Sequence, residues 1–99
     1  MKKQMNEGFQ LIHDMMKLRW IPEIIESIHS GHHGYNEILH NIDFLSNTEL
    51  NRKLAVLLDR KAIEKVDRGG RDGYVLTPFG KDLEHIFNHF VEMGERYLS

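Results

Sequence analysis

The sequence predicts a mainly α-helical α+β fold, in which several short helices accompany one small β-hairpin. Apolar residues recur at three- and four-residue spacing along most of the chain, as they do on amphipathic helices. The spacing changes to two only between residues 63 and 76, on either side of the glycine-rich segment Arg68–Gly73. We expect residues 1–99 to form one domain, and the absence of cysteine excludes a disulfide framework.

The first two helices are predicted from apolar spacing. The first runs from about Glu7 to Leu18. The second opens at Trp20, has Pro22 in its first turn and stops at Gly31. Its isoleucines lie at i, i+3, i+4 and i+7 and therefore share one face: Ile21, Ile24, Ile25 and Ile28.

A short third helix follows the break at residues 32–34. Tyr35 is expected to pair briefly as a strand, and Asn36 then caps the helix. The residues that this helix turns inward are Ile38, Leu39 and Ile42. At barely two turns, it serves as the first helix of a pair.

The fourth helix begins with a capping box. In this motif the Ser46 hydroxyl and the Glu49 carboxylate each satisfy a free backbone amide, which predicts a helix from Asn47 to about Arg60. Its inward stripe is Leu50, Leu54, Leu57 and Leu58. Its outward side carries Thr48, Arg52, Ala55 and Val56. Such small and mostly uncharged side chains indicate a surface that approaches another molecule closely.

A β-hairpin and a last helix complete the predicted fold. Residues 63–66 and 74–76 alternate in polarity and are expected to be strands joined by the turn Arg68–Gly73. Thr77 followed by Pro78 is typical of an N-cap and a first helical turn. The helix that they open carries a broad apolar band and extends to about residue 97.

The net charge of −2 conceals a basic segment in the middle of the chain. Residues 1–50 carry 4 basic and 7 acidic groups, residues 51–71 carry 7 and 3, and residues 72–99 carry 2 and 5. Because charges beyond a Debye length of about 8–10 Å are screened, the local surface matters more than the total. The basic segment coincides with the fourth helix and the hairpin, where it favours contact with phosphate.

Two short helices followed directly by a hairpin form a winged helix-turn-helix, whose second helix enters the DNA major groove. The order of elements therefore predicts a sequence-specific regulator of transcription that binds double-stranded DNA. The side chains expected to contact base edges are Asn47, Thr48, Asn51 and Arg52. The flanking contacts with the phosphate backbone of the DNA are expected from Lys53, Arg60, Lys65, Arg68 and Arg71.

Four short motifs carry a family resemblance. They are R-W-I-P-E-I-I from Arg19, Y-N-E-I-L from Tyr35, L-S-N-T-E-L-N-R-K-L from Leu45 and Y-V-L-T-P-F-G from Tyr74. In this order and spacing, over about two thirds of the chain, they resemble the HxlR family of bacterial winged-helix transcriptional regulators.

The resemblance implies a homodimer joined through the first helix, at about residues 7–18, and the last helix, at about residues 78–97. The composition predicts a cytoplasmic protein. The resemblance also implies an inverted-repeat DNA operator as partner and, in many members, a small-molecule or oxidative signal. The side chains expected at the dimer interface are Phe9, Ile12, Met16, Ile86, Phe87, Phe90 and Tyr97. No apolar run is long enough to span a membrane, so no membrane partner is expected.

The chain departs from the family pattern at three points. It lacks the cysteine with which many members sense thiol-reactive compounds. Thr48 and Ala55 replace basic residues that are usual in the recognition helix. The hairpin lacks the common proline pair and has only Arg71 at the matching basic position. These departures predict weaker, more salt-sensitive or differently specific DNA binding.

Two other functions compete with DNA binding. A metal site is suggested by seven histidines, of which His85 and His89 share a helix face while His29, His32 and His33 cluster near Gly31. A closed site needs about four ligands, and no hydrolytic or phosphate-loop motif is present, so we predict no metal, no cofactor and no enzyme. The stronger alternative is a winged-helix module that contacts protein instead of DNA, which the overall acidity favours.

Overall fold

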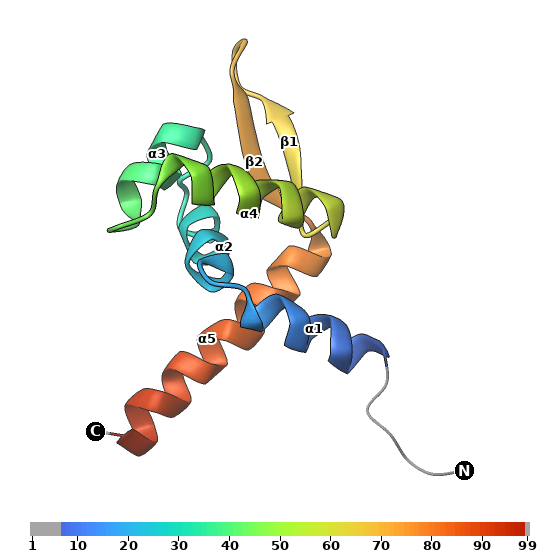
Figure 1. Ribbon diagram of the computed structural model, residues 1–99, viewed down its shortest axis with the longest axis vertical. Coiled ribbons are helices and arrows are strands. Elements are labelled where there is room, and N and C mark those ends of the chain that lie inside the picture. Colours follow the sequence, from blue (N-terminus) through green and yellow to red (C-terminus); the bar gives the residue numbers. More distant parts are fainter. Residues whose placement is uncertain (1–6, 99) are drawn as a thin grey trace.

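The computed structural model describes residues 7–98 (Figure 1). Its helices are α1 (Glu7–Lys17), α2 (Ile21–His29), α3 (Tyr35–Asn41), α4 (Asn47–Asp59) and α5 (Pro78–Leu98). Between α4 and α5, the strands β1 (Ile63–Asp67) and β2 (Asp72–Leu76) pair antiparallel, with Ile63 opposite Leu76 and Asp67 opposite Asp72. The predicted fold class, mainly α with one hairpin, is confirmed, and the elements follow the order of a winged helix-turn-helix.

The core is centred on α2, whose four isoleucines are fully buried. This helix contacts α1, α3, α5 and β2. From α4 come Leu50, Leu54 and Leu57, as the spacing predicts, while Leu58 at the edge of the stripe is half-buried. Full burial of one such side chain contributes about 1.5–3 kcal/mol, so this cluster holds the helices and the hairpin in place.

The turn between α2 and α3 differs from the prediction. Tyr35 is the first residue of α3 and not a strand residue, and an isolated β-bridge instead joins Gly34 to Gly73. The N-cap of α3 is Gly34, so the expectation that Asn36 caps this helix was wrong. Gly34 has no side chain that could accept a hydrogen bond. Its own amide donates to the Glu37 carboxylate at 2.7 Å, so this backbone N–H at the start of the helix has a partner.

The start of α4 confirms one half of the predicted capping box. The Ser46 hydroxyl accepts a hydrogen bond from the Glu49 amide at 3.1 Å. The Glu49 carboxylate pairs with side chains of its own helix instead. Just before this cap, Phe44 has a φ of 69° and is 96% exposed. The left-handed backbone costs a residue with a Cβ roughly 1–2 kcal/mol.

Thr77 caps α5 as predicted and also joins this helix to the loop between α4 and β1. Its hydroxyl oxygen accepts from the Gly80 amide at 3.1 Å, and its hydroxyl proton is donated to the Lys61 carbonyl at 2.7 Å. The Thr77 amide donates to the Ala62 carbonyl at 3.1 Å. The helix begins so close to this loop that a Cβ atom on Gly80 would overlap the Ala62 carbonyl oxygen.

The outer parts of α1 and α5 extend away from the hairpin, toward the opposite end of the molecule (Figure 1). They carry exposed apolar side chains: Phe9, Met16, Phe90, Val91, Met93, Tyr97 and Leu98. Within residues 7–98, no helix is both long enough and apolar enough to cross a membrane.

Candidate nucleic-acid interface

The outward face of α4 exposes the side chains that were expected to contact bases. Asn47, Thr48, Asn51 and Arg52 are all exposed, and so is Ala55 farther along the helix. Apart from the arginine these side chains are short. A helix about 10–12 Å in diameter can therefore enter a major groove about 12 Å wide with this face leading.

The first residue of α4 is held by the first residue of α3. The Tyr35 hydroxyl donates to the Asn47 side-chain oxygen at 2.8 Å and also lies 3.3 Å from the Asn47 backbone oxygen. With its oxygen engaged, the Asn47 amide group keeps two N–H donors for acceptors on base edges. The two residues are 12 positions apart, so helical periodicity contained no signal for this contact.

The Glu49 carboxylate forms ion pairs with two of the basic residues that are expected to contact DNA, Arg52 and Lys53. It accepts from Lys53 Nζ at 3.0 Å and from the Arg52 guanidinium at 3.4 Å. The hydrogen bond from Lys53 is the main cause that lowers the pKa of Glu49. The Lys53 side chain is only 13% exposed and lies along the helix, whereas 70% of the Arg52 side chain is exposed to solvent. Arg52 is thus the better placed of the two for a ligand.

The hairpin presents Arg71 at its turn. Gly69 and Gly70 have φ values of 67° and 90°, the positive values that a tight two-residue hairpin turn requires. Arg71 is exposed and makes no ion pair within residues 7–98. Lower on the hairpin, Lys65 pairs across the strands with Asp72 at 3.7 Å. Of these two cations, Arg71 is the one without a carboxylate partner in the described chain.

The Arg68 side chain turns back from the tip of the hairpin toward α3. Its guanidinium donates to Glu37 Oε1 at 3.1 Å. The same oxygen accepts from the amides of His33 at 3.0 Å and Gly34 at 2.7 Å. The bond from the Gly34 amide is the largest cause, and that from Arg68 the second, of the lowered pKa of Glu37. Glu37 therefore ties the hairpin to the turn between α2 and α3, a link that sequence reasoning missed.

This link predicts a pH effect on stability. The folded pKa of Glu37 lies below its unfolded value, so its stabilisation is complete above the unfolded pKa and is lost as the pH falls through the folded pKa. Glu37→Gln is expected to lower the free energy of unfolding in urea at pH 7, and the difference from the unmodified protein should vanish in acid. Glu64→Gln, at an exposed position of β1, is the control. A difference that persists unchanged at pH 3 would contradict the role of this carboxylate.

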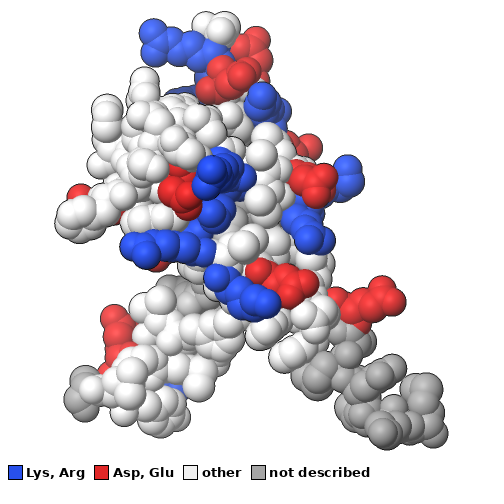
Figure 2. Space-filling model, viewed as in Figure 1, with Lys and Arg blue, Asp and Glu red and all other residues white. Residues whose placement is uncertain are grey.

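Lysine and arginine groups lie over α4 and at the end of the hairpin on the face shown in Figure 2, with carboxylates beside several of them. Arg60 caps the carboxyl end of α4 and is exposed, without an ion pair in the part of the chain that the structure describes. Arg60 and Arg71 are therefore two cations on this half of the molecule with no charge partner among residues 7–98.

The side chains expected at a dimer interface lie on α1 and α5. Phe9, Met16, Phe90 and Tyr97 are exposed. Ile12 and Ile86 are half-buried against the core. Phe87 is 7% exposed and belongs to the buried core of the chain itself.

The histidines do not converge on one site. His29 lies 3.7 Å from Glu84, and His89 lies 3.8 Å from Glu92 on the same helix. Among residues 7–98, no three side chains of His, Cys, Asp or Glu come together in a way that could hold a metal ion.

Comparison with known proteins agrees with this geometry. A family model described as HxlR-like helix-turn-helix matches residues 15–99. No curated protein matches the chain. Among solved structures, the reduced form of the transcriptional regulator YodB from B. subtilis is similar, with a TM-score of 0.82 and 21% identity over 95% of each chain.

Two more solved structures share the fold. The quinone-bound form of YodB has a TM-score of 0.80 and 22% identity, over 94% of this chain and all of that chain. A mutant of MepR from S. aureus has a TM-score of 0.72 and 17% identity, over 96% of this chain and 82% of that one. These likenesses establish the winged-helix fold, and because the family model spans most of the sequence, the chain belongs to the HxlR-like helix-turn-helix family.

Proposed function

We propose that the chain regulates transcription by binding double-stranded DNA sequence-specifically. In this proposal the recognition helix, Asn47 to Arg60, lies in the major groove, and the segment Arg68–Gly73 lies on the flanking phosphate backbone of the DNA. Membership in a helix-turn-helix family supports a DNA-binding regulator as the general class. The observation that carries the finer proposal is the exposed polar start of α4 beside a hairpin with a free cation at its turn. A cytoplasmic location in a bacterial cell is part of this proposal, because the chromosome that it would bind lies there.

Base recognition is assigned to the exposed start of α4. The Arg52 guanidinium fits the two acceptors on the major-groove edge of guanine, which it contacts with two parallel hydrogen bonds. The remaining base contacts are assigned to Asn47, Thr48 and Asn51. The Glu49 carboxylate steadies Arg52 from 3.4 Å without burying it.

Phosphate binding is assigned first to Arg60 and Arg71. Both are exposed and have no carboxylate partner within residues 7–98, so neither must give up an ion pair when it meets a phosphate. Lys53, Lys65 and Arg68 are engaged by carboxylates of the same chain. We assign to Arg68 the positioning of the hairpin through Glu37, with phosphate contact secondary.

Two substitutions separate these roles. Arg52→Ala should weaken binding to a preferred operator by about 1–3 kcal/mol and relax specificity at one position. Arg71→Ala should weaken binding to all sequences and lower the slope of log K against log salt by about 0.9 per protomer, whereas Arg68→Ala should lower that slope by less. Binding is measured by fluorescence anisotropy on operators selected from a random library, at several salt concentrations.

The division of roles is wrong if Arg52→Ala and Arg71→Ala weaken every sequence equally. If duplex DNA of any sequence fails to bind at low salt, DNA binding itself is refuted. The hairpin and α4 would then be assigned to contacts with another protein.

A homodimer completes the proposal. Exposed apolar side chains on α1 and α5 supply a surface for a second copy, and two-fold symmetry matches an inverted-repeat operator. The two recognition helices would lie about 34 Å apart, in successive major grooves on one side of the duplex. A small-molecule effector belongs to this proposal, since the similar protein YodB has a quinone-bound form.

A further inference from the structure

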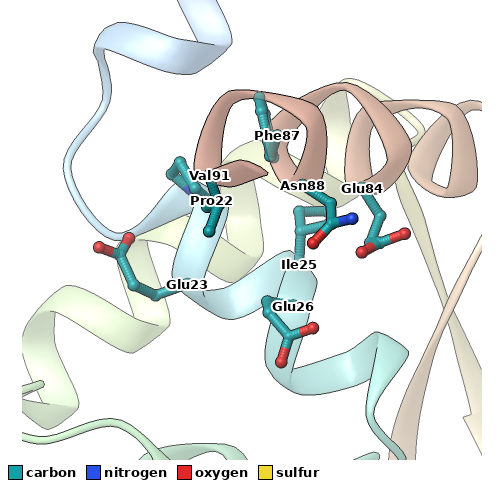
Figure 3. A pocket seen from close by; sticks show the side chains of 8 residues that line it. All are labelled: Pro22, Glu23, Ile25, Glu26, Glu84, Phe87, Asn88 and Val91. Carbon is teal, nitrogen blue, oxygen red and sulfur yellow. The ribbon is translucent and has the colours of Figure 1, made fainter. Parts of the chain in front are cut away.

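A hollow between α2 and α5 lies outside the DNA-contacting elements (Figure 3). Its volume is about 200 Å³. Its apolar lining consists of Pro22 and Ile25 from α2 and Phe87 and Val91 from α5. Ile25 and Phe87 also belong to the core, so the floor of the hollow is fixed by packing and not by mobile surface groups.

The polar groups around this apolar floor are acidic. Glu23 and Glu26 come from α2, and Glu84 comes from α5 beside the Asn88 carboxamide. Among residues 7–98, no lysine or arginine lines the hollow. The Glu84 side chain is only 15% exposed, and its partner is the His29 ring at 3.7 Å. The hollow therefore combines an apolar floor with a strongly negative rim.

We propose that this hollow binds a small organic cation with an apolar body, such as an amine or quaternary ammonium that carries aliphatic or aromatic groups. The apolar part gains by leaving water, at roughly 25 cal/mol per Å² of buried surface. The charged part is attracted by three carboxylates, and desolvation of a diffuse ammonium charge is easier than that of a compact ion. A bare metal ion does not fit, because no three ligating side chains converge within residues 7–98.

The position of the hollow links ligand binding to regulation, a consequence that rests on the proposed function. α5 carries the proposed dimer surface, and α2 packs against α3 in the helix-turn-helix. A ligand held between α2 and α5 changes the angle between the dimer surface and the DNA-contacting unit. It therefore changes the distance between the two recognition helices, and with it the affinity for DNA.

The test is a titration of the full chain with benzyltrimethylammonium, followed by isothermal calorimetry and by NMR amide shifts. Shifts are expected to concentrate on α2 and α5. The uncharged isostere neopentylbenzene should bind at least about threefold more weakly. Glu84→Gln should weaken binding of the cation by about two- to fivefold, the effect of losing one partly exposed charge partner.

Glu23→Gln provides a second variant at the rim, and Glu64→Gln on β1 is the matched control, which should bind the cation unchanged. The proposal is overturned if the isostere binds equally well, if both rim variants bind the cation unchanged, or if the shifts lie elsewhere. Absence of binding overturns it too.

The regulatory consequence has its own readout. Saturating benzyltrimethylammonium should change the affinity for a DNA operator at least threefold, and an unchanged affinity would refute the coupling. If the chain binds no DNA but still binds the cation with the expected selectivity, the proposed function fails while the ligand site stands.

Discussion

Gly80→Ala is expected to lower the free energy of unfolding by about 3 kcal/mol, the upper part of the range for overpacked sites. The Cβ atom would overlap the Ala62 carbonyl oxygen, which is backbone and cannot rotate away. The same oxygen accepts a hydrogen bond from the Thr77 amide. Any shift of the Ala62 carbonyl that makes room for the Cβ atom therefore weakens this hydrogen bond, which helps to orient α5. Urea unfolding followed by circular dichroism measures the loss.

The matched control is Gly94→Ala in the same helix. A Cβ at that position meets nothing within 4 Å. Alanine there is expected to raise stability by about 0.5–1 kcal/mol, because glycine in a helix interior loses more conformational freedom on folding. Similar changes at both positions would show that the Gly80 effect comes from helix propensity and not from the close approach of α5 to Ala62.

Phe90→Glu is expected to have the largest effect on function. Phe90 is 47% exposed on α5 and lies on the proposed dimer surface. A carboxylate at that position would have to be desolvated against the apolar side chains of a second copy. The variant should therefore sediment as a monomer, and loss of two-site binding should weaken binding to an inverted repeat at least about 100-fold.

The comparison for oligomeric state is Phe44→Glu. Phe44 is even more exposed, but it lies in the turn between α3 and α4, away from the proposed surface. Sedimentation of this variant should match that of the unmodified protein. If Phe90→Glu stays dimeric and binds the operator with unchanged affinity, the assignment of α5 to the dimer interface is wrong.

The sequence predicted the fold where its signals act over a few residues. Ser46 and Thr77 cap their helices as expected, because a capping side chain reaches amides only two or three residues ahead. The inward leucines of α4 followed from helical spacing. The prediction failed at Gly34, because glycine caps a helix without a side-chain hydrogen bond, and Asn36 nearby is a stronger N-cap residue type.

The candidate site was predicted as a set of residues and not as a set of contacts. Sequence position placed Arg52, Arg60 and Arg71 on the two elements expected to face DNA, and all three are exposed. It did not show that the Arg68 side chain turns back from the hairpin tip, because its partner Glu37 lies 31 residues away.

The sequence by itself determined the order of the helices and the hairpin, their caps and the inward face of α4, because these depend on spacing and backbone geometry within a few residues. Only the tertiary structure decided which cations are free and where a hollow forms. Those features arise from the packing of α2 against α5 and of the hairpin against the α2–α3 turn, which brings together side chains that are far apart along the chain.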